Sequence, residues 1–521
     1  MHCKKIHNYT FGLCIFFSCV FSFEISAQFY NFPSDNSFSV LTEKQLAAKD
    51  SAIHGGIKPY VHFFSSKYVQ VVDTHRLFKF IKDDPAIDLV FYKHFIRVEP
   101  KTEKFKLRLD PVLNLEVGKD FSNNPSGRLY CNTRGLIGSG YVGDNVYFET
   151  MVVENQSFLP SYLSDYANTS SVIPGQGRWK QFKTTGYDYA FSSGFVSVQA
   201  LKNLNIQVGH GKQKIGNGYR SLLLSDNTLN YPYTRFTQQW FKGKVQYTNI
   251  YAVLMNLVSA STIVNPNTER LFQKKAASFQ YLSINFSRSF NIGFFQGMVW
   301  QAGDSRNKQH IDWQYFNPII YTNLMSYGLD NKNNIITGLD AKLKIGNKVN
   351  VYSQLMLDKT KSDSTSAAWG WQAGLNYFDA FGLKNLFLQF EYNNVKRGSY
   401  SSSVNTSDQS YSHYNQNLAY TPGYGEEFVL IADYKVRRFF VNLRYNYQDI
   451  PQNTISGTNT NYVSMINAKV GYLINPSYNL NICLGILYRT QKNPIFNPLN
   501  NQVNYIYLGF KTSLYNLYYD F

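Results

Sequence analysis

The chain has 521 residues, of which 17% are aromatic and only 16% are charged, whereas about 25% of the residues of a soluble protein are usually charged. This composition argues against an ordinary soluble domain and indicates an outer-membrane β-barrel, in which aromatic side chains form girdles at both interfaces and polar side chains face the lumen. The formal net charge of +17 favours an anionic partner, such as lipopolysaccharide or an acidic polysaccharide, although extra cations at turns and membrane borders would explain it equally well.

Residues 1–27 are typical of a secretory signal peptide. Lys4 and Lys5 precede an apolar run over residues 11–23, and Ala27 supplies a small residue for cleavage. The apolar run is too short for a transmembrane helix, which needs about 20 residues. A lipoprotein cleavage site at Cys19 is the alternative, but the phenylalanines before it fit that site poorly. We therefore expect export with cleavage after Ala27, and an exported protein meets no genomic nucleic acid.

After the leader, no stretch carries the roughly 18 apolar residues of a membrane-spanning helix, so the sequence excludes a helical membrane protein. Cys131 and Cys483 are the cysteines that remain in the mature chain. They lie far apart, each within an expected strand, so we expect two free thiols, no metal site and no cofactor.

Residues 28–103 differ in pattern from the rest of the chain. Good helix formers predict a helix over 41–49, and a second helical pattern covers 74–83. Aromatic, strand-like pieces cover 60–64 and 86–96. We expect a small N-terminal α/β portion that is periplasmic or tucked into the barrel mouth.

From residue 104 onward the chain alternates apolar and polar residues in segments of about 10, which is typical of a transmembrane barrel. The sequence predicts about eighteen strands (16–18) and a barrel over residues 104–521. The segments are 104–121, 128–140, 146–155, 187–201, 204–211, 235–242, 245–258, 274–288, 290–300, 334–346, 349–357, 368–378, 384–392, 426–436, 438–447, 461–474, 478–488 and 502–521.

Connections between these segments alternate in length. Every second one is a tight turn rich in Gly, Asn, Asp or Pro, such as 143–145 and 475–477. Those between them are mostly long, as at 156–186, 301–333 and 393–425. Bacterial barrels have short periplasmic turns and long extracellular loops. The alternation therefore predicts a barrel with its long loops outside the cell.

The last segment alternates aromatic and apolar residues as far as Phe521. A final strand that ends in phenylalanine resembles the signal used by the outer-membrane insertion machinery. With an even strand count, both termini are expected in the periplasm.

The stretch 206–236 has neither a strand nor a helix period over most of its length. It contains Gly209, Gly211, Gly216 and Gly218, which permit backbone shapes that other residues forbid. We expect a shaped loop on the long-loop side that faces the cell exterior or folds into the lumen.

Two other long loops, which carry residues 178–180 and 313–315, contain aromatic and charged residues that could bind a ligand, as residues 206–236 do. Aromatic rings there suit stacking on sugars, and charged groups suit acidic ligands. The candidate ligand-binding residues are Arg178, Trp179, Lys180, Lys212, Lys214, Arg220, Asp226, Trp313 and Tyr315. For Arg220 and Asp226 the alternative is an internal ion pair that anchors the loop, since buried charges must be paired. The leucines at 222–224 favour this anchor, because exposed leucines are costly.

Catalysis is the weakest hypothesis. His210, Ser221 and Asp226 lie close in sequence, but no G-x-S-x-G motif and no zinc-type histidine pair is present. The gap between Gly211 and Gly216 matches a phosphate loop, but Asn217 stands where that loop needs lysine. We therefore predict no catalytic residues.

Residues 173–198 (IPGQGRWKQFKTTGYDYAFSSGFVSV) and 209–233 (GHGKQKIGNGYRSLLLSDNTLNYPY) carry a family resemblance. They resemble the RemB-like gliding-motility-associated outer-membrane proteins of Bacteroidetes, which are similar to the Wzi-type capsule-assembly barrels. The resemblance implies a barrel at the cell surface with a role in gliding, in attachment of surface polysaccharide, or in both, and with motility or adhesin proteins as further partners.

Three functions follow as hypotheses. The first is a non-enzymatic surface barrel that binds or assembles polysaccharide or serves gliding; the second is a porin-like channel or transporter; the third is a barrel hydrolase. Loops 212–234 and 301–333 discriminate between the first two, because loops folded inward would close the lumen.

Overall fold

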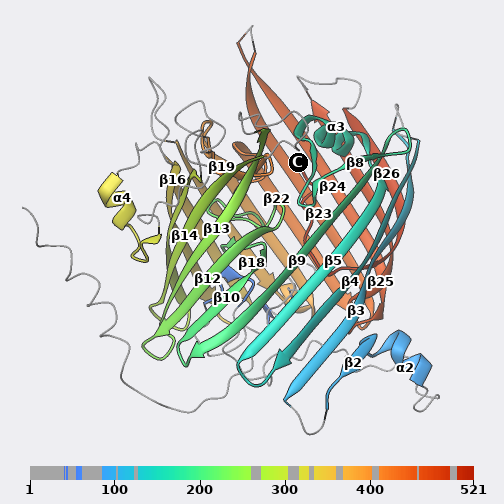
Figure 1. Cartoon of the computed structure of the whole chain (residues 1–521). Helices are drawn as coiled ribbons and strands as arrows, with labels where there is room; N and C mark the ends of the chain where they lie inside the picture. The colour runs from blue at the N-terminus through green and yellow to red at the C-terminus, as the bar shows by residue number, and fades with distance from the viewer. Residues whose placement is uncertain are drawn as a thin grey trace, which may run out of the picture.

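In the computed structural model, an 18-stranded antiparallel barrel closes where the last strand pairs with the first. The structure describes residues 40, 43–44, 54–60, 85–100, 104–122, 127–259, 272–302, 316–327, 334–358, 368–401, 410–454, 457–492 and 501–521. Short turns gather at one end of the barrel, and the longer connections gather at the other (Figure 1). We call them the short-turn end and the long-loop end.

The barrel strands are β3 (Phe105–Asp120), β4 (Arg128–Val142), β5 (Val146–Phe158), β9 (Gly186–Leu201), β10 (Leu204–Gly211), β12 (Tyr231–Trp240), β13 (Val245–Ser259), β14 (Phe272–Asn285), β15 (Phe290–Gln301), β16 (Asn334–Ile345), β17 (Val349–Asp358), β18 (Ala368–Phe378), β19 (Leu386–Val395), β22 (Gly425–Val436), β23 (Phe439–Thr454), β24 (Gly457–Asn475), β25 (Leu480–Lys492) and β26 (Gln502–Thr512). Shorter elements are β1 (Ile57–Lys58), α2 (Pro85–Phe91), β2 (Ile96–Val98), α3 (Ser161–Ser170), β6 (Val172–Ile173), β7 (Gly177–Arg178), β8 (Lys180–Phe182), β11 (Lys214–Ile215), α4 (Thr322–Tyr327), η3 (Ala380–Gly382), β20 (Ser412–His413) and β21 (Gln416–Asn417).

The predicted fold class is confirmed, because each of the expected segments overlaps one strand of the closed barrel. β10 and β18 match their predicted ranges residue for residue. β12 begins at Tyr231 rather than at the expected residue 235. Pro232 lies within this strand and cannot donate a ladder hydrogen bond, so the sequence pattern favoured a later start.

The period-2 alternation separates two environments along each strand. On β25, Ile482, Leu484 and Ile486 are exposed on the outer wall, whereas Cys483 and Leu487 on the opposite face are buried. An outward apolar face with a filled interior is the pattern of a membrane barrel. Among the described helices, none is both long and apolar enough to cross a bilayer.

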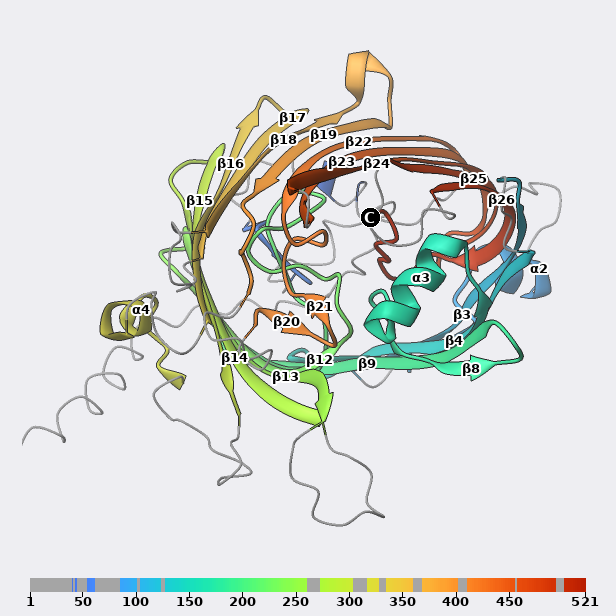
Figure 2. The same ribbon diagram turned by 90° about the horizontal axis from the view of Figure 1, so that it is seen from above.

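The prediction that the last strand reaches Phe521 is wrong. β26 ends at Thr512, and residues 513–521 turn back into the barrel as a tail without strand pairing (Figure 2). The pairing of β26 with β3 stops at Lys511, opposite Asn114. Further along the same edge of β3, β2 pairs with Leu107 to Leu109, so a longer β26 would have no free partner there.

The tail changes the position of the last residue. β26 returns to the short-turn end, as the even strand count predicts, but the tail then runs through the lumen toward α3. Tyr162 of α3 donates a hydrogen bond to the Tyr519 carbonyl at 2.8 Å, and Arg489 donates to the main-chain oxygen of Phe521 at 3.0 Å. Phe521 therefore lies beside α3 rather than at the short-turn end.

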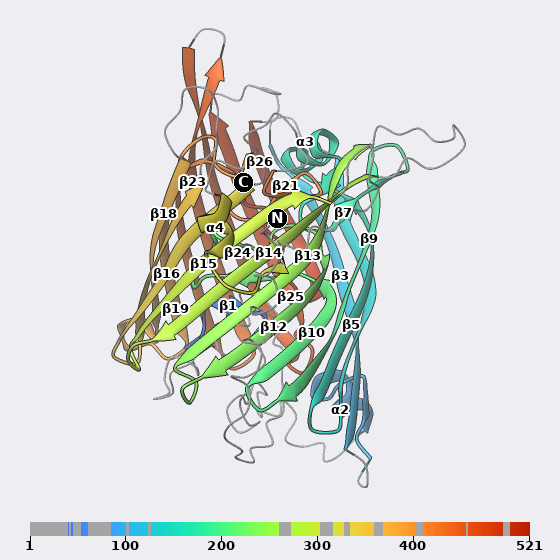
Figure 3. The same ribbon diagram turned by 60° about the vertical axis from the view of Figure 1, so that its left-hand side comes forward.

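The strand expected over 86–96 is also wrong, because α2 occupies most of this range. Pro85 stands at the first helical position, where its missing N–H costs nothing. The apolar run after it is too short for its period to separate strand from helix. α2 lies at the short-turn end of the barrel (Figure 3). Asn475, in a short turn, donates to the carbonyls of Leu89, Val90 and Lys93 and so satisfies the end of α2.

Part of the N-terminal portion lies inside the lumen. β1 pairs with β11, and the His54 ring contacts Ser283 Oγ and the Gly243 carbonyl, both at 2.8 Å. Of the helix expected over 41–49, Glu43 and Lys44 are described and are helical. The signal peptide, the helix over 74–83 and residues 61–64 lie outside the described residues, and the division at residue 103 stays a prediction. Cys131 and Cys483 are free thiols.

Candidate functional site

Several described segments fill the lumen, and three of them carry most of the candidate residues or their partners. They are residues 54–60, the lumen loop (residues 212–230, between β10 and β12) and the C-terminal tail (residues 513–521). In Figure 2 their ribbons lie inside the ring of strands. Almost every side chain of the lumen loop is buried. The loop is therefore folded into the lumen. This is one of the two orientations that the sequence left open, the other being exposure at the cell exterior.

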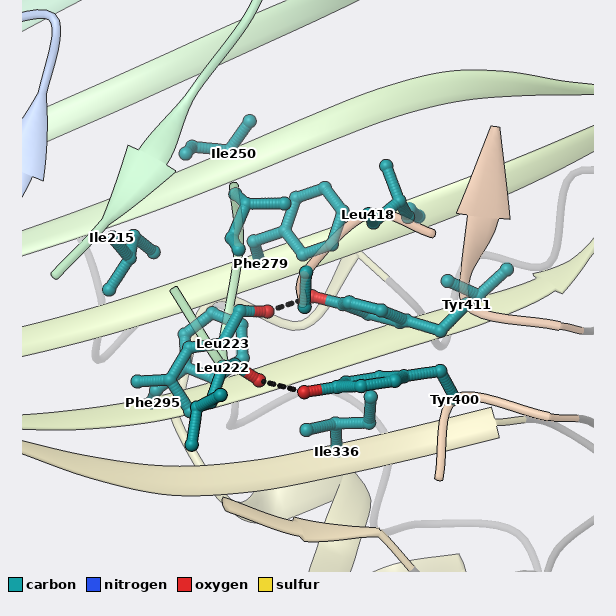
Figure 4. Close-up of a cluster of buried hydrophobic side chains, with 14 of the residues drawn as sticks. Ile215, Leu222, Leu223, Ile250, Phe279, Phe295, Ile336, Tyr400, Tyr411 and Leu418 are labelled. Carbon is teal, nitrogen blue, oxygen red and sulfur yellow. Dashed lines mark hydrogen bonds between the residues drawn. The ribbon is translucent and has the colours of Figure 1, made fainter. Parts of the chain in front are cut away.

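The leucines of the lumen loop pack against the inner barrel wall (Figure 4). Leu222, Leu223 and Leu224 are fully buried in a cluster that includes Phe279 and Phe295. A Cβ on Gly338 would lie 2.3 Å from a methyl of Leu223, so glycine at this position lets the loop approach the wall. Burying each leucine contributes about 1.5–3 kcal/mol. The expectation that these leucines pack inward is confirmed.

Two tyrosines fix the loop backbone over this cluster. Tyr400 donates to the Leu222 carbonyl at 2.9 Å, and Tyr411 donates to the Leu223 carbonyl at 2.7 Å (Figure 4). Both come from the connection between β19 and β22 and are buried. A second long connection therefore holds the first in place.

Arg220 is the charged centre of the filled lumen and is 1% exposed. Its guanidinium lies 2.7 Å from Glu427 Oε1 and 3.3 Å from Asp520 Oδ1, and it also donates to the Asp520 carbonyl at 2.7 Å. Glu391 accepts the backbone N–H groups of Tyr219 and Arg220 at 2.6 and 3.0 Å. These contacts join the lumen loop to β19, β22 and the tail.

Asp226 joins the loop to the tail a second time. It accepts hydrogen bonds from Tyr518 at 2.8 Å and Asn516 at 3.0 Å, and Lys214 Nζ lies 4.0 Å away. Burial alone would raise the pKa of Asp226, but Lys214 and these hydrogen bonds hold the pKa below its usual range. Burial lowers the pKa of Lys212 to about 8, and its ammonium donates to the Gly175 carbonyl at 3.0 Å.

The predicted candidate residues thus fall into separate places. Arg220 and Asp226 are buried with partners inside the lumen, which is the anchor alternative weighed for them rather than an open vestibule. Lys214 is buried beside Asp226, and Lys212 is half-buried at the start of the same loop. Trp179 packs edge-on to Tyr187 at 4.7 Å and donates to a carbonyl of α3. The Trp179 ring is therefore used in packing within the protein.

The remaining candidates lie toward the surface or outside the described residues. Arg178 and Lys180 are exposed, and the Arg178 guanidinium lies 4.8 Å from the centre of the Phe272 ring. Trp313 and Tyr315 lie outside the described residues.

The residues weighed for catalysis have separate partners. Ser221 donates to the Ile215 carbonyl at 2.5 Å, and the His210 ring contacts the Ser192 carbonyl at 3.0 Å. Asp226 is bound to the tail. Within the described ranges, no group of His, Cys, Asp and Glu side chains is placed to hold a metal ion.

The connection between β15 and β16 does not close the lumen in its described part. Residues 316–327, which we call the wall strap, lie on the outer surface of the barrel (Figures 1 and 2). Tyr251 donates to the Phe316 carbonyl at 3.0 Å, and Gln280 donates to the Asn317 carbonyl at 2.7 Å. Gln280 lies between inward-facing Phe279 and Tyr281 and therefore faces outward. The strap covers a polar part of the outer wall that would otherwise face lipid.

The acidic partners of Arg220 were not among the sequence candidates. Glu391 is the one charged residue of β19 and lies at an inward-facing position, which was the signal that could have revealed it. Glu427 follows the exposed Glu426 on β22, and only the strand alternation marks Glu427 as the inward-facing member of this pair. The sequence did not indicate Asp520 as a partner of Arg220, because Asp520 was expected to lie at the end of the last barrel strand.

No family model matches the chain, and no curated protein matches it. Among solved structures, the chain is similar to Wzi of Escherichia coli, described as a carbohydrate-binding β-barrel of the outer membrane involved in group 1 capsule assembly. The two share 13% identity with a TM-score of 0.53, over 94% of this chain and 100% of that one.

Two further solved structures match less well. OpdK of Pseudomonas aeruginosa, solved with vanillate, has 10% identity and a TM-score of 0.45 over 78% of this chain and 98% of its own. OccAB2 of Acinetobacter baumannii has 10% identity and a TM-score of 0.44 over 78% and 97%. The likeness to Wzi at 13% identity shows a shared barrel fold.

Proposed function

We propose that the chain is a non-enzymatic outer-membrane barrel that binds or organises polysaccharide at the cell surface and serves capsule assembly, gliding motility or both. The observation that carries this proposal is the filled lumen. The lumen loop and the C-terminal tail cross the pore, and buried ion pairs between Arg220, Glu427 and Asp520 hold them there. A plugged barrel suits a binding scaffold better than a diffusion channel.

Two further observations support the proposal. Wzi, which has the same fold, is described as a carbohydrate-binding barrel. The resemblance of residues 173–236 to RemB-like proteins of Bacteroidetes adds the gliding role. Apolar side chains exposed along the outer wall favour a membrane location.

In this proposal the long-loop end faces outward from the cell, and the short-turn end and the N-terminal portion face the periplasm. Arg178 and Lys180, which are exposed, and Trp313 and Tyr315 make the first contacts with an anionic glycan. Lipopolysaccharide surrounds the barrel, and motility or adhesin proteins are its further partners.

The test compares cells with and without the gene for two properties, the binding of purified surface polysaccharide and the spreading of colonies. We expect loss of the gene to reduce at least one of them, and the chain with Arg178→Gln and Lys180→Gln to restore polysaccharide binding only in part. Unchanged binding and spreading after loss of the gene would contradict the proposal and leave a transport role as the next hypothesis.

A further inference from the structure

A cavity of 180 Å³ lies under the lumen loop, toward the short-turn end. Its wall consists of the ends of β22, β24 and β26 and the beginnings of β23 and β25, which flank the short turns. Tyr219 of the lumen loop and Tyr515 of the tail form its boundary on the other side. The cavity is therefore separate from the candidate residues 178–180 at the long-loop end.

The ionisable side chains that line this cavity are mostly basic. Lys435, Arg444, Lys469 and Lys511 are the basic ones and Asp433 is the acidic one, so the lining carries a net charge of +3. Two carboxylates behind the lining, Glu116 and Asp520, lie 3.4 Å from Lys511 and 3.5 Å from Arg444. Because the lining itself carries four basic side chains and one carboxylate, the cavity favours an anion.

The neutral part of the lining suits a sugar ring. Phe440 and Tyr515 offer aromatic surface, and Asn442 and Asn481 offer amide donors and acceptors. Asn442 already donates to Asp433 at 2.5 Å, which fixes the orientation of its amide. Aromatic surface with a few placed polar groups is typical of small-molecule sites.

The size of the cavity limits the ligand. An apolar cavity of about 150 Å³ takes up one benzene molecule, so 180 Å³ admits one ring and not a chain of rings. The barrel strands around the cavity, and the lumen loop and C-terminal tail above it, prevent a polymer from passing through the cavity.

We propose that this cavity binds a single saccharide unit that carries a carboxylate or a phosphate, with Lys435 and Lys469 as the main contacts of the anionic group. The inference rests on the proposed function and names its ligand class. It adds a second site at the short-turn end, distinct from contact with polymer at the cell surface.

The test measures binding to the purified full-length chain in detergent micelles by calorimetry. The probes are glucuronate and glucose 1-phosphate, with glucose as the neutral control and inorganic phosphate as the control without a sugar. We expect both acidic sugars to bind at least ten-fold more tightly than either control, and their binding to weaken as the salt concentration rises. The proposal is overturned if glucose binds as tightly as glucuronate, or if phosphate binds as tightly as glucose 1-phosphate. It is also overturned if none of the probes binds.

Variants assign the binding to the cavity. The double variant Lys435→Gln and Lys469→Gln should lose at least ten-fold in affinity for glucuronate, whereas Lys344→Gln, near the short-turn end of β16 and outside the lining, should lose none. Equal melting temperatures show that all three proteins are folded. If the double variant still binds glucuronate like the unaltered chain, the cavity inference fails.

Binding of purified surface polysaccharide, measured in parallel, separates the two proposals. If the polymer binds to the unaltered chain but glucuronate does not bind in the cavity, the cavity inference falls and the proposed function stands. If glucuronate binds in the cavity but no polymer binds at the surface, the proposed function falls.

Discussion

Arg220 is the residue on which the filled lumen depends most. The sequence favoured an anchor role for it, because a buried charge needs a partner. The partners themselves could not be predicted, since Glu427 and Asp520 lie 207 and 300 positions away. No local pattern encodes a contact of that range.

We expect Arg220→Met to lower the free energy of unfolding by about 3–5 kcal/mol, because it leaves buried carboxylates without their cation. Urea titration in lipid vesicles measures this change. Arg178→Gln, at an exposed position, is the control and should change the free energy by less than about 0.5 kcal/mol. A loss below about 1 kcal/mol for Arg220→Met would show that the network is not needed for stability.

The titration of Asp226 makes a second prediction at this scale. Its pKa is lowered in the folded chain, so its stabilising effect is present above the unfolded pKa of about 3.9 and is lost as pH falls through the folded pKa. We therefore expect Asp226→Asn to lower the melting temperature at pH 7, and the difference from the unaltered chain to shrink toward pH 3. A difference that stays constant over this range would contradict the assignment.

At the scale of elements, strands were far more predictable than the segments that fill or cover the barrel. The period-2 pattern and the alternation of loop lengths located the barrel strands, since each depends only on neighbouring residues. The tail after β26 carries the same alternation, but β2 occupies the edge of β3 that it would need. Whether a segment pairs depends on which edge is free, and the sequence pattern does not contain that information.

The leucines of the lumen loop give a prediction for this element. Leu223→Ala should lower the free energy of unfolding by about 2–5 kcal/mol, because it leaves a cavity between the loop and the barrel wall. The matched control is Leu383→Ala, whose side chain is 54% exposed. Equal effects of the two changes on urea unfolding would show that the loop does not pack as described.

The wall strap gives a further prediction. Gln280→Cys and Asn317→Cys should be joined by a short bismaleimide in a chain whose native cysteines are replaced by alanine, because the Gln280 side chain contacts the Asn317 backbone. The control pairs Asn317→Cys with Lys119→Cys, which lies on the outer face of β3. This pair should give no crosslink. Mass spectrometry of the digested protein measures the outcome, and equal crosslinking of both pairs would place the strap elsewhere.

At the scale of the whole molecule, the barrel strands surround buried segments that come from distant parts of the chain. The sequence predicted the barrel strands and identified lumen closure as the feature that separates a binding barrel from a channel. It could not show whether the lumen is closed, because the direction in which a long loop folds depends on buried partners on other strands. The lumen loop folds inward, whereas the described part of the β15–β16 connection folds outward.

Single-channel recording in planar lipid bilayers tests this account most directly. We predict no steady current from the full-length chain, and steady currents from a variant in which a short glycine–serine linker replaces the lumen loop. The variant must first be shown to form a barrel, by its resistance to unfolding in cold detergent. Large steady currents from the unaltered chain would contradict the closed lumen on which the account depends.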